Sequence, residues 1–154
     1  MTQVGKKHFD GPDIVPETIK KTWSDIEQEV MNIARRINYR QDNIEVIVGL
    51  SRGGLIPGVM LSHALNVPFV PLVWQTRDGN VQWTNHLQVY DKPTTLVVDD
   101  LIDSGETFYQ VKETAPDVKY CALFNKQPSI SLDYWGSTLY NEHRWLDFPW
   151  EKTV

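Results

Sequence analysis

Apolar residues recur at helical spacing near the start of the chain, at Trp23, Ile26, Val30, Ile33 and Ile37. Steps of three and four residues place such side chains on one face of a helix, with the polar residues between them facing solvent. Thr22 followed by Asp25 resembles a capping box, in which a side chain and a backbone N–H satisfy each other at a helix start. The pattern therefore predicts an amphipathic helix over residues 23–38.

Beyond this helix, short apolar runs alternate with further helical segments. The runs favour strands at residues 44–50, 69–74, 94–98 and 119–124,. Residues 54–65 are apolar nearly all round, as a buried helix would be. A third helix contains Phe108 and Val111 and is stopped by Pro116. Buried strands alternating with helices predict an α/β fold in which a mainly parallel, twisted sheet is flanked by helices.

The remaining segments carry weaker signals. Residues 1–16 read as an irregular leader, and residues 75–91 are polar, with Asp78-Gly79 as a turn signal and residues 82–84 as a possible hairpin arm,. The chain has no internal repeat and no Ser/Gly linker, so we expect residues 1–154 to form a single domain.

Composition excludes several classes of protein. A net charge of −5 over 154 residues argues against broad nucleic-acid binding, which usually needs a basic surface,. No apolar run has the length of a membrane span, and the first residues lack the apolar stretch of a signal peptide, so we expect a cytoplasmic location. The single cysteine, Cys121, lies in an apolar run and is interpreted as a small core residue,.

Two unusual turns follow expected strands, at residues 51–54 and 99–107. In open α/β sheets, ligands bind at the carboxyl ends of the strands. Since parallel strands share that edge, both turns should lie on the same side of the sheet.

The second turn carries most of the chemistry. Asp99 and Asp100 are acceptor-only groups, suited to vicinal ribose hydroxyls or to hydrated Mg²⁺. Residues 104–107 leave backbone N–H groups free at a helix start, where a phosphate monoester binds favourably. An Asp-Asp-x-x-Asp metal motif also occurs on long helices of prenyl-chain synthases, but Gly105 and the apolar run before Asp99 favour strand and loop. A solvated acidic turn without chemistry is the remaining alternative.

Residues 96–107 resemble the phosphoribosyl-pyrophosphate signature of the type I phosphoribosyltransferases: an apolar strand, two acidic residues, two apolar residues, then Asp-Ser/Thr-Gly-x-Thr. Three further segments resemble the bacterial xanthine-guanine phosphoribosyltransferases. These are residues 51–58, like their pyrophosphate loop, residues 124–126, like their strand ending in a purine-binding lysine, and residues 145–151, like their C-terminal hood. The resemblance runs from about residue 20 to residue 151, and implies a hood formed by roughly residues 126–154 with the N-terminal part.

The resemblance implies a binding site for phosphoribosyl pyrophosphate. Its residues would be Ser51, Arg52, Gly53, Arg77, Asp99, Asp100, Asp103, Ser104, Gly105, Glu106 and Thr107, with Mg²⁺ held at Asp100. Arg52 and the neighbouring glycines would clamp the pyrophosphate, and the family pattern places a cis peptide between Ser51 and Arg52. Arg77 is the best candidate in residues 75–90 for a cation that reaches the pyrophosphate; His86 is one alternative, and the other is that neither residue does so.

The resemblance also implies a purine site made by Asp103, Lys126, Trp145 and Leu146. Asp103 would face N7 of the purine as general base, and Lys126 would donate a hydrogen bond to the 6-oxo group. Trp145 would stack on the base, while backbone carbonyls near Leu146 and Asp147 would read its C2 side.

The expected function is therefore purine salvage. Ribose 5-phosphate would pass from phosphoribosyl pyrophosphate to a 6-oxopurine, with guanine and xanthine ahead of hypoxanthine. A regulatory protein of the same fold, which senses nucleotides and binds nucleic acid, is the alternative, although the acidic charge disfavours it. Lys126 and Trp145 disfavour a pyrimidine-specific relative. The family likeness further implies a homo-oligomer, either a dimer or a tetramer.

Overall fold

Five parallel strands form the central sheet, in the order β3-β2-β6-β7-β8. The protein is seen here in a computed structural model that describes residues 17–74, 76–77, 80–81 and 84–151. The strands are β2 (Val46–Leu50), β3 (Phe69–Leu72), β6 (Thr95–Ile102), β7 (Lys119–Asn125) and β8 (Tyr134–Thr138). This sheet confirms the predicted α/β fold.

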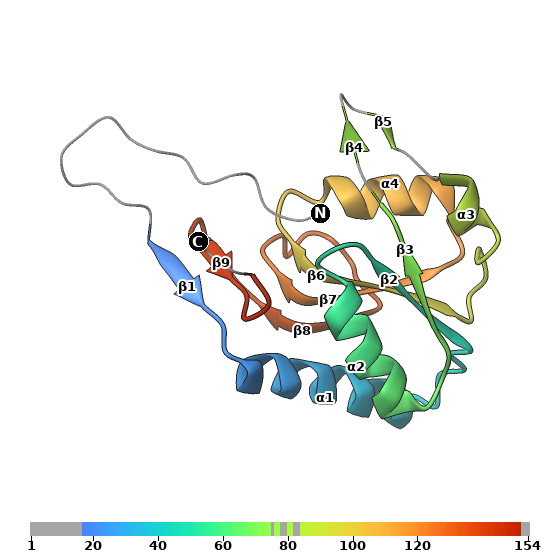
Figure 1. The fold of residues 1–154 in the computed structure, drawn as a ribbon, viewed down its shortest axis with the longest axis horizontal. Coiled ribbons are helices and arrows are strands. Elements are labelled where there is room, and N and C mark those ends of the chain that lie inside the picture. The colour runs from blue at the N-terminus through green and yellow to red at the C-terminus, as the bar shows by residue number, and fades with distance from the viewer. Residues whose placement is uncertain (1–16, 75, 78–79, 82–83, 152–154) are drawn as a thin grey trace.

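Helices cover both faces of the sheet (Figure 1). The helices α1 (Trp23–Tyr39) and α2 (Leu55–Leu65) pack on one hydrophobic cluster, which includes the fully buried Cys121. The helix α4 (Glu106–Thr114) and the short α3 (Thr84–Gln88) pack on the cluster of the opposite face. No helix in the described ranges combines the length and apolar character that a membrane crossing requires. The cytoplasmic location stays a prediction.

The first helix begins where the sequence predicts. Thr22 Oγ1 accepts the backbone N–H of Asp25 at 3.1 Å, and Asp25 Oδ2 accepts that of Thr22 at 2.8 Å. This reciprocal capping box satisfies two N–H groups that a helix start otherwise leaves without partners. The buried positions of α1 are Ile26, Val30, Ile33, Ala34 and Ile37.

Three predictions need correction. The helix α2 is buried only at Pro57, Gly58 and Leu61. Its composition predicts a helix buried on all sides, and this prediction is wrong for its outer side. The strand β6 continues to Ile102, because Asp99 and Asp100 extend the pairing with β7 instead of opening the turn. A hairpin is present, but its arms are β4 (Thr76–Arg77) and β5 (Asn80–Val81). Residues 82–83 of the predicted arm lie outside the described residues, and Thr84 begins α3.

A small second sheet joins the two ends of the described chain. The strand β1 (Thr18–Lys20) pairs in parallel with β9 (Trp145–Asp147), next to the main sheet (Figure 1). The expected hood therefore contains a strand from each terminal region. The segment 126–154 does not belong to it throughout, since β8 forms an edge of the central sheet. The predicted leader, residues 1–16, lies outside the described residues.

Candidate functional site

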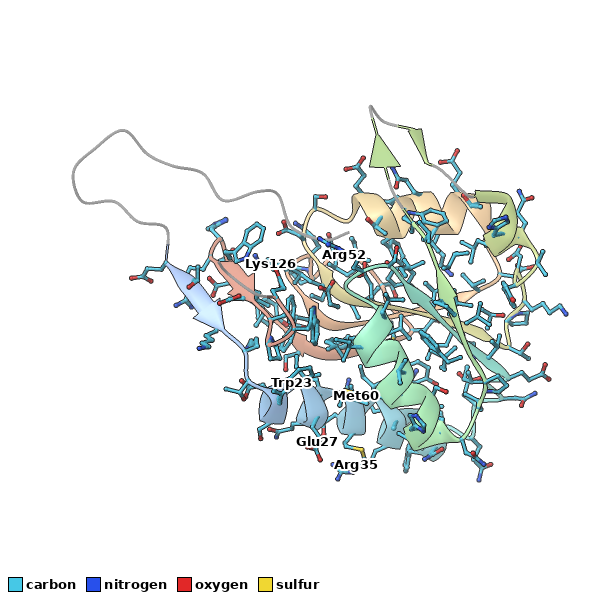
Figure 2. The ribbon with its side chains drawn as sticks, viewed as in Figure 1. Trp23, Glu27, Arg35, Arg52, Met60 and Lys126 are labelled. Carbon is cyan, nitrogen blue, oxygen red and sulfur yellow. The ribbon has the colours of Figure 1, made fainter. Side chains whose placement is uncertain are left out.

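Four chain segments leave the same edge of the sheet, because β2, β3, β6 and β7 run parallel. They are residues 51–54 after β2, residues 73–74 after β3, residues 103–107 after β6, and residues 126–127 after β7. Figure 2 shows Arg52 and Lys126, from two of these segments, on the same side of the molecule. The prediction that both unusual turns share one side is confirmed.

Residues 51–54 form a tight loop fastened to β3. The Ser51 N–H donates to the carbonyl of Leu72 at 2.9 Å, and Ser51 Oγ accepts the N–H of Trp74 at 3.3 Å. The peptide between Ser51 and Arg52 is cis, as the resemblance implies. The Arg52 side chain is exposed, so its guanidinium is open to an anionic ligand,.

Asp99 lies within β6 and has partners for both carboxylate oxygens. Its Oδ2 accepts the hydroxyl of Tyr120 at 3.0 Å, and its Oδ1 accepts the backbone N–H of Asp100 at 2.9 Å. The tyrosine lies in the buried cluster beneath α4, where burial and then the Asp99 charge raise its pKa well above the ordinary value. Asp99 therefore links β6 to β7 through Tyr120. Its contact with substrate stays a prediction.

Asp100 follows along the strand, and neighbouring side chains of a strand point to opposite faces. Its Oδ1 is buried and has no hydrogen-bond partner in the described part of the chain. Burial and then the charge of Asp99 raise the pKa of Asp100 well above its usual range. An ionised carboxylate held in this way needs a cation or a donor, and the described residues supply none to Oδ1,.

The turn after β6 opens directly into α4. Gly105 caps the helix with a φ of 91°, a left-handed conformation that side chains disfavour, and a methyl group there would stand 2.6 Å from Ile130 Cδ1,. Ser104 Oγ accepts the N–H of Glu106 at 3.3 Å. The exposed Glu106 side chain accepts from Gln110 along the helix, also at 3.3 Å, while Thr107 is buried. The loop thus leads directly into a helix start, a feature that can bind phosphate through its backbone N–H groups.

Asp103 and Lys126 meet across the ends of β6 and β7. Lys126 Nζ lies 3.5 Å from Asp103 Oδ1 and donates to the carbonyl of Arg144 at 2.7 Å. The Lys126 side chain is only 7% exposed, which argues against an ordinary surface lysine. Gln127 fixes the backbone of Asp103, because its Nε2 donates to the Asp103 carbonyl at 2.7 Å. An ammonium group and a carboxylate are therefore held side by side at the ends of β6 and β7.

Glu142 and Arg144 also belong to this arrangement, although no sequence pattern predicts it. The Glu142 carboxylate accepts three hydrogen bonds from Arg144, from the backbone N–H at 3.1 Å, Nε at 2.7 Å and Nη2 at 2.9 Å. The bond to the Arg144 side chain lowers the pKa of Glu142 to about 2. These bonds fix the peptide whose carbonyl holds Lys126. Only the order Glu-x-Arg could have drawn attention to the pair, and that spacing is common.

The purine-site residues of the hood are placed by β9. Trp145 directly follows Arg144, the residue whose carbonyl accepts a hydrogen bond from Lys126. Leu146 alternates to the other face and is fully buried in the core beneath α1. The carbonyl of Asp147 accepts the N–H of Lys21 at 2.8 Å and keeps one lone pair,. The side chain of Leu146 is thus structural, while its backbone remains the predicted contact with a base.

Two candidates from the polar segment cannot be joined to this site. Arg77 lies in β4, opposite Asn80, but its side chain is outside the described residues. His86 is exposed in α3, on the α4 side of the sheet. The contact of either residue with a pyrophosphate stays a prediction.

Comparison with known proteins agrees with this geometry. The family model described as "Phosphoribosyl transferase domain" matches residues 21–127. The xanthine-guanine phosphoribosyltransferase of Idiomarina loihiensis is 28% identical over 138 residues, which is 84% of each chain. The enzyme of the same name from Chromohalobacter salexigens is also 28% identical over 138 residues, covering 86% of this chain and 83% of its own.

A solved structure shows the same likeness in three dimensions. The purine phosphoribosyltransferase of Pyrococcus horikoshii superimposes with a TM-score of 0.72 at 27% identity. The match covers 89% of this chain and 96% of the archaeal one. The similarity therefore extends beyond the residues that the family model matches.

Proposed function

This chain belongs to the phosphoribosyl transferase domain family, and on that basis we propose that it is a purine phosphoribosyltransferase. It transfers ribose 5-phosphate from phosphoribosyl pyrophosphate to a 6-oxopurine, and releases pyrophosphate. Guanine and xanthine are the preferred bases, with hypoxanthine next. The names of the relatives support this choice. The observation that carries it is the Lys126–Asp103 pair, a buried ammonium beside a carboxylate.

Lys126 explains the selection of a 6-oxopurine. An ammonium has three donors and no acceptor, and one donor is already directed to the Arg144 carbonyl,. A 6-oxo group can accept from another donor, whereas the 6-amino group of adenine presents hydrogens of its own. Sites that hydrogen-bond a substrate in this way discriminate strongly against analogues that leave the buried polar group without a partner.

Asp103 supplies the proton chemistry. As pyrophosphate leaves, positive charge builds on the ribose, and the attacking purine must lose a proton. A carboxylate at N7 accepts that proton and stabilises the growing charge. Lys126, whose Nζ lies 3.5 Å from Asp103 Oδ1, helps to keep this carboxylate in place.

The other residues bind the sugar phosphate. The N–H groups at the start of α4, with Ser104 and Thr107, hold the 5-phosphate. Arg52 and the backbone of residues 52–54 hold the pyrophosphate. Arg77 from the segment after β3 is proposed to complete the pyrophosphate site, with His86 as the alternative. Asp99, whose carboxylate also accepts the hydroxyl of Tyr120, and Asp100 are proposed to contact the ribose hydroxyls,.

Mg²⁺ is the proposed cofactor, and Asp100 fits it. Its Oδ1 is a buried acceptor without a partner in the described residues, the kind of oxygen that a hydrated hard cation satisfies,. The described residues contain no cluster of three or more metal-ligating side chains, so most ligands would come from substrate and water. When bound, the cation neutralises charge on the diphosphate.

A panel of bases tests the proposal. Purified full-length chain is given phosphoribosyl pyrophosphate with guanine, xanthine, hypoxanthine, adenine or uracil, each with Mg²⁺ and with a chelator. Pyrophosphate release with the three 6-oxopurines, and none with adenine or uracil, is expected only in the Mg²⁺ arm. If pyrophosphate release with adenine equalled that with guanine, Lys126 would not select 6-oxopurines over adenine. Equal rates with the chelator would show that the reaction does not need Mg²⁺.

A further inference from the structure

Lys126 has a closer partner than the carboxylate beside it. Its ammonium donates to the carbonyl of Arg144 at 2.7 Å, whereas Asp103 Oδ1 lies 3.5 Å from the same nitrogen. A close hydrogen bond between an ammonium and a carboxylate spans about 2.7–2.9 Å. The two charges are therefore held next to each other without closing into a tight ion pair.

Two separate braces set this spacing. On the side of the carboxylate, Gln127 Nε2 donates to the Asp103 carbonyl at 2.7 Å, and Asn125 Oδ1 accepts the Gln127 N–H at 2.8 Å. Because Gln127 directly follows Lys126 in the chain, this brace fixes the backbone of Asp103 relative to the end of β7. The second brace holds the carbonyl of Arg144, to which the ammonium is bonded.

A local turn provides the second brace. The paired residues of β9 begin at Trp145, so Arg144 stands just before the pairing with β1. Asn141 turns the chain with a φ of 52°, a left-handed conformation that asparagine adopts more readily than most residues,. Glu142 then folds back onto Arg144 and accepts its backbone N–H and two N–H groups of its guanidinium. This arrangement, the Glu142–Arg144 clamp, fixes Arg144 in place and its carbonyl with it.

The charge of Glu142 reaches Lys126 as well. The bond to the Arg144 side chain is the main cause that lowers the pKa of Glu142 to about 2, and the charge of Lys126 is a smaller one. The Glu142 carboxylate is therefore ionised near neutral pH. Lys126 thus interacts with two carboxylates, Asp103 and Glu142, and the Arg144 carbonyl is the group to which it bonds.

We propose that Glu142 is a positioning residue for the purine donor: by holding Arg144, it keeps the Lys126 ammonium on the Arg144 carbonyl and prevents its closure onto Asp103. A closed pair would occupy the donor intended for the 6-oxo group and the carboxylate intended for the purine proton. This inference rests on the proposed function for its effect on turnover, whereas the environment of the ammonium can be measured without substrate.

Glu142→Gln tests the positioning role in the reaction. Glutamine keeps the length of the side chain but has no charge to hold the guanidinium, so the clamp loosens. We expect kcat/KM for guanine to fall about 10- to 100-fold, the effect of a small misplacement, while the KM for phosphoribosyl pyrophosphate stays within about twofold. Arg144→Ala keeps the carbonyl but removes the clamp, and should give the same loss. Glu27→Gln, at an exposed glutamate of α1, is the matched control.

A double-mutant cycle shows whether Glu142 acts through Lys126. In a Lys126→Ala background, Glu142→Gln should lower kcat/KM for guanine by no more than about twofold, because the residue that it positions is gone. A loss as large as that in the wild-type background would overturn the proposal, since Glu142 would then act on the fold or on the substrate directly. Equal losses of affinity for both substrates would overturn it as well.

NMR of the lysine ammonium groups in the unliganded full-length protein tests the spacing itself. With isotope-labelled lysine, the Lys126 signal is identified by its absence from the Lys126→Ala spectrum. Glu142→Gln should shift this signal, and Asp103→Asn in the same chain should largely remove the shift, because the carboxylate on which the ammonium closes is then missing. A Lys126 signal that Glu142→Gln leaves unchanged would overturn the proposal.

The two readouts separate this inference from the proposed function. A wild-type chain that released no pyrophosphate with any purine would contradict the proposed function. The NMR comparison would still decide whether Glu142 positions Lys126, because it uses neither substrate. Circular dichroism of each variant checks that the chain remains folded.

Discussion

The α-carbon of Gly53 lies directly against the carboxylate of Asp100. A methyl group built on Gly53 would stand 2.3 Å from Asp100 Oδ2, far inside van der Waals contact. The loop at residues 51–54, after β2, and the acidic end of β6 are therefore in contact. This contact leaves Asp100 no room to move toward the loop.

Gly53→Ala should consequently weaken the binding of phosphoribosyl pyrophosphate. Overpacking of a tight contact costs about 1–3 kcal/mol, which corresponds to about 5- to 150-fold in affinity. The measurement is the dissociation constant by titration calorimetry, with Gln28→Ala on exposed α1 as the control. An unchanged dissociation constant would show that Gly53 is not part of the substrate site.

Asp100→Asn should stabilise the unliganded protein while it weakens substrate binding. The wild-type carboxylate has a pKa raised by burial and by Asp99, so its ionisation costs the folded state free energy. Stability of the wild type should therefore fall relative to the variant as the pH rises through that raised pKa. We expect the variant to gain about 1–3 kcal/mol at pH 8, the cost of a buried polar group without a partner, and less at pH 4. Urea unfolding at both pH values measures this gain, and a pH-independent difference would contradict it.

Lys126→Ala tests the contact with the purine. Loss of a charged hydrogen bond should raise the KM for guanine by about 1.5–3 kcal/mol in free energy. The KM for phosphoribosyl pyrophosphate should hardly change. Lys92→Ala, at an exposed lysine, is the matched control. If both substrates lost affinity equally, Lys126 would support the fold or the phosphates instead.

Asp103→Asn tests the chemical step. Asparagine keeps the size and a capping oxygen but cannot accept a proton, so kcat should fall about 10²–10⁴-fold. Binding of phosphoribosyl pyrophosphate should survive within several-fold, because the loop at residues 104–107 remains. Asp117→Asn, at an exposed aspartate, controls for the change in charge. Near-normal turnover would remove Asp103 from the mechanism.

The sequence predicted those parts of the molecule that local chemistry determines. The capping box fixed the start of α1, and the apolar run before Asp99 indicated β6. The acidic and glycine-rich turn could be recognised because each residue type is required where it stands, as the left-handed Gly105 illustrates.

The rest depended on contacts between distant segments. Residues 134–138 lack the apolar alternation of a strand, since β8 is an edge strand. Its exposed Trp135 lies beneath the guanidinium of Arg36 of α1. The bond between Asp99 and Tyr120 follows from the register of β6 and β7, which periodicity does not give. Likewise, Arg144 reaches Lys126 through its backbone carbonyl, a contact that no side-chain pattern records.

The most direct test of the central claim is product analysis with the wild-type protein. The chain is incubated with Mg²⁺, guanine and phosphoribosyl pyrophosphate, and the products are separated and identified by mass spectrometry. We expect the purine nucleoside 5′-monophosphate and pyrophosphate in equal amounts, with no nucleotide when guanine is replaced by adenine. Pyrophosphate without nucleotide, or no consumption of either substrate, would contradict it.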